Sequence, residues 1–237
     1  YVGVDIFFVI SGYLITKLII LEQKQNKFSF TNFYLRRIRR IMPALFTVAF
    51  FSYPFALFFF LPTQLLEFIR SLFSGIFFSS NFFFYFSEID YYSLPSIYKP
   101  LLHYWSLSVE EQFYFVYPIS LFLIYKFFEK KLTLVFIIIG ILSFAFSIFL
   151  SNYDHTLNFY LFPTRIWEFL VGAFAAKIHL QNFDIKNHKL KFFIQIIGLV
   201  LIFFSIFYFE EFNNENTNLL RNILFSHPGF ATLLPVG

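Results

Sequence analysis

Long apolar stretches separated by short polar segments run along the whole chain. Six of them are candidate spans: 2–21, 43–61, 105–128, 132–150, 162–176 and 192–209. A helix of about 20 apolar residues crosses the hydrocarbon core of a bilayer. The pattern therefore predicts an all-α fold, a polytopic membrane helix bundle with about six spans.

A seventh apolar stretch, 68–86, is long enough to cross but is rich in polar side chains, at Arg70, Ser71, Ser74, Ser79, Ser80 and Asn81. Three connections are basic: 22–42 has six basic residues and one acidic, a net charge of +5, while 126–131 and 177–191 carry +2 and +3. The other connections are neutral to acidic. Basic loops favour the cytoplasm, and all three can lie there only if 68–86 does not cross. We predict an outer re-entrant or interfacial helix there, with both ends of this chain outside.

The most basic connection contains Arg36, Arg37, Arg39 and Arg40. On a helix these four side chains fill one arc of about 160°, with apolar residues opposite. The pattern predicts an interfacial helix with a basic face, ended by Pro43. The arginines either set topology and contact anionic membrane lipid or clamp the phosphates of a nucleotide-like donor.

The stretch 103–114 places Glu110, Glu111 and His103 at the start of an apolar run. Carboxylates beside a membrane span are costly and indicate a functional site. If the helix reaches back to His103, then His103, Ser106 and Glu110 lie within about 60° of one another. The alternative for Glu111 is helix capping, because Ser108 and Glu111 have capping-box spacing.

Two further sites place charge in or beside a span. Asp5 lies near the start of the first span, and Arg165 and Glu168 stand three residues apart in another. All three are candidate site residues, although Arg165 and Glu168 could simply form an ion pair. The Ser11–Gly12–Tyr13 notch favours close helix packing.

Composition excludes a soluble domain. The chain is 58% hydrophobic and 25% aromatic, with 43 phenylalanines and 14% charged residues. Without cysteine it offers no thiolate metal site, and we expect no metal. It begins without methionine and ends without a polar tail, so we expect residues 1–237 to be a partial domain truncated at both ends. A net charge of +4 is modest, and no nucleic-acid partner is expected.

Four segments together resemble the membrane acyltransferase 3 family, the bacterial O-acetylases of surface polysaccharides. They are the first span from Gly3 to Thr16, the arginine block up to Pro43, the run 99–114 and the segment 163–168. They cover nearly the whole chain in the family's order, and the first and third are long enough to be specific. The lead-in 99–103 also resembles members with an appended extracytoplasmic hydrolase-like domain.

The resemblance implies a multi-pass protein of the bacterial inner membrane. It implies an acyl donor, usually acetyl-coenzyme A, on the cytoplasmic side, and transfer to a hydroxyl of an extracytoplasmic polysaccharide or lipid-linked glycan. Arg36, Arg37, Arg39 and Arg40 match the donor-side motif, and Glu110 and Glu111 match the acceptor-side acidic pair. The family's activating histidine would precede Tyr1, so His103 is not that residue.

The main rival is a proton-coupled transporter or flippase, in which the same carboxylates would relay protons. Transporters often show internal repeats and broken spans, and no repeat is visible here. A purely structural scaffold would have no use for adjacent glutamates in a span. The long motif matches favour the enzyme.

Overall fold

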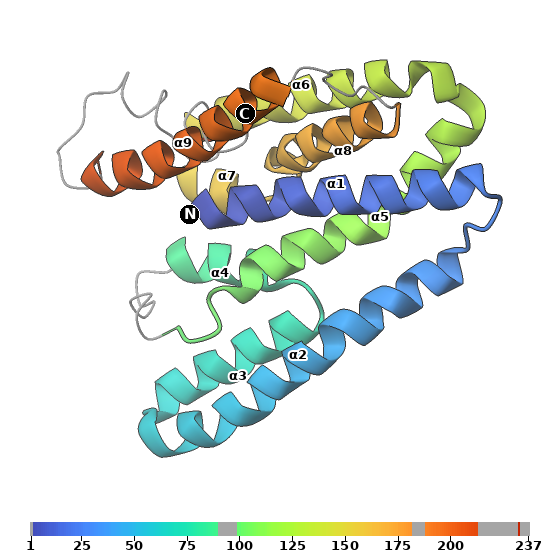
Figure 1. The fold of residues 1–237 in the computed structure, drawn as a ribbon. Coiled ribbons are helices and arrows are strands. Elements are labelled where there is room, and N and C mark those ends of the chain that lie inside the picture. The colour runs from blue at the N-terminus through green and yellow to red at the C-terminus, as the bar shows by residue number, and fades with distance from the viewer. Residues whose placement is uncertain (1, 90–98, 182–187, 213–231, 233–237) are drawn as a thin grey trace. The chain divides into compact units, whose positions relative to one another are not determined.

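The computed structural model describes residues 2–89, 99–181, 188–212 and 232, and every regular element within these ranges is helical. The all-α prediction is confirmed. The α-helices in Figure 1 are α1 (Val2–Lys24), α2 (Phe30–Phe59), α3 (Pro62–Ile76), α4 (Ser80–Ile89), α5 (Tyr104–Phe128), α6 (Leu132–Ser151), α7 (His155–Tyr160), α8 (Ile166–Leu180) and α9 (His188–Phe212). The chain divides into two compact units, with 1–20 and 120–237 in unit 1 and 21–119 in unit 2.

Three helices of the described residues, α1, α2 and α6, are long and apolar enough to cross a membrane. The chain is therefore a multi-pass membrane protein. Six spans were predicted, and the other three coincide with the helices α5, α8 and α9. Helix α8 has 15 residues and measures about 22 Å, less than the roughly 30 Å of the hydrocarbon core.

Helix α2 runs unbroken through Pro43 and Pro54. The prediction that Pro43 ends the arginine helix is wrong. Proline removes one backbone hydrogen bond of the ladder, but leaving the helix within an apolar stretch would strip many more backbone groups of partners in lipid. The hydroxyl of Thr47 donates to the Pro43 carbonyl at 2.7 Å. The arginines and the second span therefore belong to one continuous helix.

The stretch 68–86 is divided between α3 and α4, which are joined by a turn at 77–79 with Phe78 at φ 51°. Helix α5 holds this turn. The Ser80 N–H donates to Ser108 Oγ at 3.1 Å, and Gln112 Nε2 donates to the Phe78 carbonyl at 3.1 Å and to Asn81 Oδ1 at 2.9 Å. No helix of spanning length runs through this stretch, as the re-entrant prediction requires.

A buried lysine anchors the start of α5 in unit 2. Lys99 Nζ lies 3.2 Å from Glu88 Oε1 on α4 and 3.9 Å from Glu67 Oε1 on α3. Two residues later, Leu101 packs into an apolar cluster with Ala56 of α2 and Phe68 of α3. These contacts fix where α5 begins, and therefore the height of Glu110 along it.

In unit 1, α1 and α8 cross in backbone contact. A Cβ built on Gly12 would lie 2.0 Å from the Phe169 carbonyl oxygen, and one on Gly172 would lie 1.9 Å from the Val9 carbonyl oxygen. Two glycines therefore let the backbones approach as small residues do in membrane helices. The predicted packing role of the Ser11–Gly12–Tyr13 notch is confirmed. Helix α6 packs along α8 (Figure 1).

Candidate functional site

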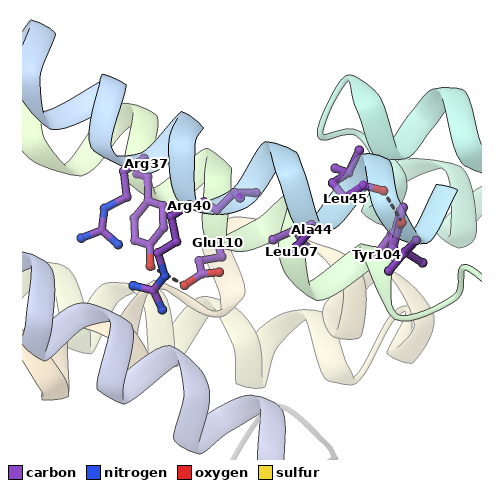
Figure 2. A pocket seen from close by; sticks show the side chains of 10 residues that line it. Arg37, Arg40, Ala44, Leu45, Tyr104, Leu107 and Glu110 are labelled. Atoms are coloured by element: carbon purple, nitrogen blue, oxygen red, sulfur yellow. Dashed lines mark hydrogen bonds between the residues drawn. The ribbon is translucent and has the colours of Figure 1, made fainter. Parts of the chain in front are cut away.

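A cavity of about 260 Å³ lies between α2 and α5 in unit 2. Its polar lining is Arg37, Arg40, Glu110, Tyr104 and Tyr114, and its apolar lining is Ile41, Ala44, Leu45, Val48 and Leu107. Figure 2 shows the two arginines and Glu110 gathered at one end, with Tyr104 and Leu45 at the other. The cavity therefore has a charged end, formed by Arg37, Arg40 and Glu110, which continues into an apolar trough formed by the apolar lining residues.

Two tyrosines set the register of α2 against α5. The Tyr34 hydroxyl donates to the Phe115 carbonyl at 3.0 Å, and the Tyr104 hydroxyl donates to the Leu45 carbonyl at 3.3 Å. Eleven residues separate the two contacts on each helix, in opposite chain directions, so the helices are antiparallel. This register brings the arginine turn of α2 to the level of Glu110.

One tyrosine contacts both Arg37 and Glu110 at the charged end of the cavity. Tyr114 donates its phenol hydrogen to Glu110 Oε1, one helical turn away. The Arg37 guanidinium lies 5.0 Å from the centroid of the same ring and 5.6 Å from that of Phe33. Such cation–π contacts hold a guanidinium in place without using up its N–H donors. Glu110 is 5% exposed and Tyr114 4% exposed.

Not all four arginines line the cavity. Arg37 and Arg40 line the cavity, whereas Arg36 donates to Glu22 Oε1 at 2.8 Å and Arg39 is exposed. Arg36 is paired with the end of α1, which supplies Glu22. Within unit 2, the cavity therefore has two arginines available for an anionic ligand.

The arginines and Glu110 were expected at opposite ends of the bundle. The structure contradicts this separation, because Arg37, Arg40 and Glu110 line one cavity. The physical reason is the register of α2 against α5, which places the arginine turn beside the second turn of α5.

His103 does not join Glu110 in the described structure. The helix begins at Tyr104, so the condition for a shared face is not met, and His103 is exposed in the preceding turn. Three-residue turn bonds, from Tyr104 N–H to Leu101 and from Trp105 N–H to Leu102, form this corner. Ser106 Oγ donates back to the His103 carbonyl at 3.0 Å.

Glu111 is not part of a helix cap. Ser108 and Glu111 lie well inside α5, and the Ser108 hydroxyl accepts from the Ser80 N–H. The capping alternative is therefore excluded. Glu111 Oε1 is buried and has no hydrogen-bond partner among the residues that the structure describes. An unpaired carboxylate oxygen in an apolar setting is costly, which marks Glu111 as a group available to a ligand.

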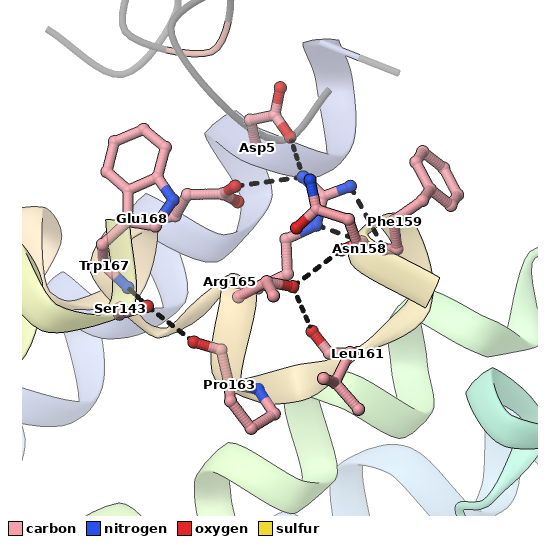
Figure 3. A network of polar contacts seen from close by, with 10 residues as sticks. Asp5, Ser143, Asn158, Phe159, Leu161, Pro163, Arg165, Trp167 and Glu168 are labelled. Atoms are coloured by element: carbon pink, nitrogen blue, oxygen red, sulfur yellow. Dashed lines mark hydrogen bonds and ion pairs between the residues drawn. The ribbon is translucent and has the colours of Figure 1, made fainter. Parts of the chain in front are cut away.

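A second charged group is buried in unit 1, where Asp5, Arg165 and Glu168 meet (Figure 3). Arg165 Nη1 lies 3.1 Å from Asp5 Oδ1 and 3.0 Å from Glu168 Oε1, and all three side chains are fully buried. The Nε and Nη2 atoms of Arg165 both donate to the Phe159 carbonyl at 3.3 Å. The ion pair considered from the sequence is confirmed, and Asp5 completes it.

Arg165 has little capacity left for a ligand, because these bonds use four of the five donors that a guanidinium offers. The loop before α8 is fixed in the same way. The Thr164 hydroxyl bonds to the Asn158 and Leu161 carbonyls, both at 2.7 Å, and Ser143 Oγ donates to the Pro163 carbonyl at 2.6 Å. The buried group of Asp5, Arg165 and Glu168 is therefore a structural tie, by which we mean a set of contacts that holds α1, α7 and α8 together.

Sequence reasoning missed Tyr114, which contacts both Glu110 and Arg37. The available signal was its position four residues after Glu110, where side chains meet on one helix face. It was hidden by the many aromatic residues, since 43 phenylalanines and 15 tyrosines make one more tyrosine uninformative.

The family model for the acyltransferase domain matches residues 1–234. An uncharacterized protein of Haemophilus influenzae is 35% identical over 240 residues, covering 98% of this chain and 93% of that protein. The O-acetyltransferase OatA of Staphylococcus aureus is 33% identical over 207 residues, covering 84% of this chain. The match spans 34% of the length of that relative. No solved structure matches.

Proposed function

Since the chain belongs to the acyltransferase domain family, we propose that it forms part of an enzyme that moves an acetyl group from coenzyme A to a glycan hydroxyl. The donor enters from the cytoplasm, and the acceptor is a polysaccharide or lipid-linked glycan outside the bacterial inner membrane. The name of the Staphylococcus aureus relative, O-acetyltransferase, supports the acyl group and the hydroxyl acceptor.

The observation that carries the proposal is the shared cavity of Arg37, Arg40 and Glu110. Two guanidiniums suit a phosphate-bearing donor, because they form charge-assisted, bidentate hydrogen bonds with phosphate oxygens. The apolar trough beyond them, from Ile41 to Val48, suits the uncharged arm of an acyl thioester. Arg36 and Arg39 lie outside the lining and contribute at most to the approach of the donor.

In the reaction, the acceptor oxygen bonds to the thioester carbonyl carbon and the carbon–sulfur bond breaks. The hydroxyl proton passes to a base and then to the departing thiolate of coenzyme A. We assign Glu110 to this proton transfer, either directly or by stabilising the protonated form of the histidine that the family resemblance implies. Glu111, with a buried oxygen that has no partner in the described residues, is available to the acceptor hydroxyl.

The proposal is tested by acetyl transfer from radiolabelled acetyl-coenzyme A in membranes that contain the intact protein. Glu110→Gln keeps the shape of the side chain and removes its charge, so we expect turnover to fall roughly 100-fold or more. Glu22→Gln is the matched control, because its ion pair with Arg36 is exposed and contributes little.

The arginine pair is tested separately by binding. Arg37→Ala with Arg40→Ala should weaken coenzyme A binding by a few kcal/mol, whereas Arg70→Ala, exposed on α3, should not. Arg→Lys changes should restore binding only in part, because the planar fork is lost. Normal binding and turnover in both sets of variants, at wild-type membrane levels, would reject the proposed site.

A further inference from the structure

We propose that Tyr114 is the positioning residue of the cavity, and that its hydroxyl and its ring have separate tasks. The hydroxyl orients the Glu110 carboxylate for transfer, and the ring holds the Arg37 guanidinium for donor binding. The inference rests on the proposed function, because it assumes that Glu110 and Arg37 act in acetyl transfer.

The contacts of Tyr114 separate cleanly into two parts. Its hydroxyl donates to Glu110 Oε1 from the next turn of the same helix. Its ring face lies 5.0 Å from the Arg37 guanidinium, which comes from the facing helix α2. The side chain is 4% exposed and lines the cavity. Within the described lining, it therefore contacts both the carboxylate of Glu110 and the guanidinium of Arg37.

The hydroxyl bond has a chemical consequence. A carboxylate has two oxygens, and a fixed donor on Oε1 restricts rotation of the group and leaves Oε2 in a defined direction. A hydrogen bond to a charged group is stronger than one between neutral groups. The orientation of the carboxylate affects the transfer step, so its loss should lower kcat.

The ring contact has a different consequence. The Arg37 guanidinium contacts the rings of Phe33 and Tyr114, at 5.6 Å and 5.0 Å from their centroids. Because neither ring uses an N–H, the guanidinium keeps its donors for an anionic ligand while its position is fixed. Loss of the ring should therefore weaken donor binding, and loss of the hydroxyl alone should not.

The experiment compares two substitutions in the intact protein with acetyl-coenzyme A as the donor. Tyr114→Phe removes the hydroxyl and keeps the ring, so kcat should fall about tenfold to a hundredfold with the donor KM nearly unchanged. Tyr114→Leu removes both, so the donor KM should rise as well, by about fivefold. Tyr13→Phe is the matched control, since it removes a phenol hydrogen bond, with His179 in unit 1, outside the cavity lining.

A double-substitution cycle separates this inference from the proposed function. In a Glu110→Gln background, Tyr114→Phe should have little further effect, because the two residues act as one unit. A low rate for Glu110→Gln with a normal rate for Tyr114→Phe would overturn the inference and leave the proposed function standing. Equal losses in Tyr114→Phe and Tyr13→Phe would also overturn it, since a general loss of phenol hydrogen bonding, unrelated to Glu110, would then explain both. Normal turnover of Glu110→Gln would remove the premise of both proposals.

Discussion

At the residue scale, access from solvent distinguishes the two charged groups. In unit 1, one arginine meets two carboxylates, with every side chain fully buried. In unit 2, two arginines share a cavity with Glu110. The first group is closed to solvent, and its arginine is bound to two carboxyl groups and a carbonyl, as suits a structural tie. The second lines a cavity and offers two guanidiniums, as suits an anionic ligand.

The tie in unit 1 predicts unequal effects of its substitutions. Arg165→Met should destabilise the protein by about 3–5 kcal/mol, because it leaves two buried carboxylates without their cation. Asp5→Asn should cost less than about 1 kcal/mol, since the amide keeps an acceptor for Arg165 and the pair with Glu168 becomes neutral. Thermal unfolding of the detergent-solubilised protein measures both, and equal losses would contradict the tie.

At the element scale, helix contacts are set by the smallest side chains. Gly12 and Gly172 bring α1 and α8 together, and each would place a Cβ within about 2 Å of a carbonyl oxygen on the other helix. That distance is far inside van der Waals contact, and the obstacle is backbone, which cannot rotate away. The two helices would have to separate.

The crossing predicts a position-specific response to alanine. Gly12→Ala and Gly172→Ala should each lower stability by about 1–3 kcal/mol, the usual cost of overpacking. Gly3→Ala is the matched control on the same helix, because a Cβ there meets nothing within 4 Å. The midpoint of thermal unfolding in detergent checks the set. A loss of stability at Gly3 as large as that at Gly12 would contradict the proposed effect of the crossing, because a Cβ at Gly3 meets no neighbouring helix.

The periodicity of the sequence was sufficient to predict the helices but not their ends or partners. Pro43 looks like a helix end by its own chemistry, yet the lipid environment of the following residues outweighs one lost hydrogen bond. The start of α5 at Tyr104 depends on Lys99 reaching Glu88 and Glu67, contacts that no local pattern reveals. Glu110 and the arginines were therefore each identified from the sequence, while their meeting in one cavity was not.

At the scale of the whole molecule, the basic loops predict the orientation in the membrane. The chain lacks cysteine, so single cysteines can report sidedness in a background without others. Gln25→Cys and Lys130→Cys should be shielded from an impermeant thiol reagent in intact cells, because basic loops favour the cytoplasm. Asn152→Cys should react.

Detergent-permeabilised cells supply the control, since all three cysteines should then be labelled. Labelling of Lys130→Cys from outside intact cells would mean that the stretch containing α3 and α4 crosses the membrane. That result would reverse the predicted sidedness of every helix that follows.

Because α2 is unbroken, the thickness of the bilayer affects where the arginines of the cavity lie relative to the membrane. Its 30 residues measure about 45 Å, well beyond a hydrocarbon core of roughly 30 Å. The part that follows Arg40, residues 41–59, measures about 28 Å and matches that core. The position of the arginine turn along the membrane normal is thus set by how the rest of α2 fits the lipid. A thinner bilayer tilts such a helix, and the tilt carries Arg37 and Arg40 with it. Lipid chain length is therefore a geometric parameter of the site, although no lipid needs to touch it.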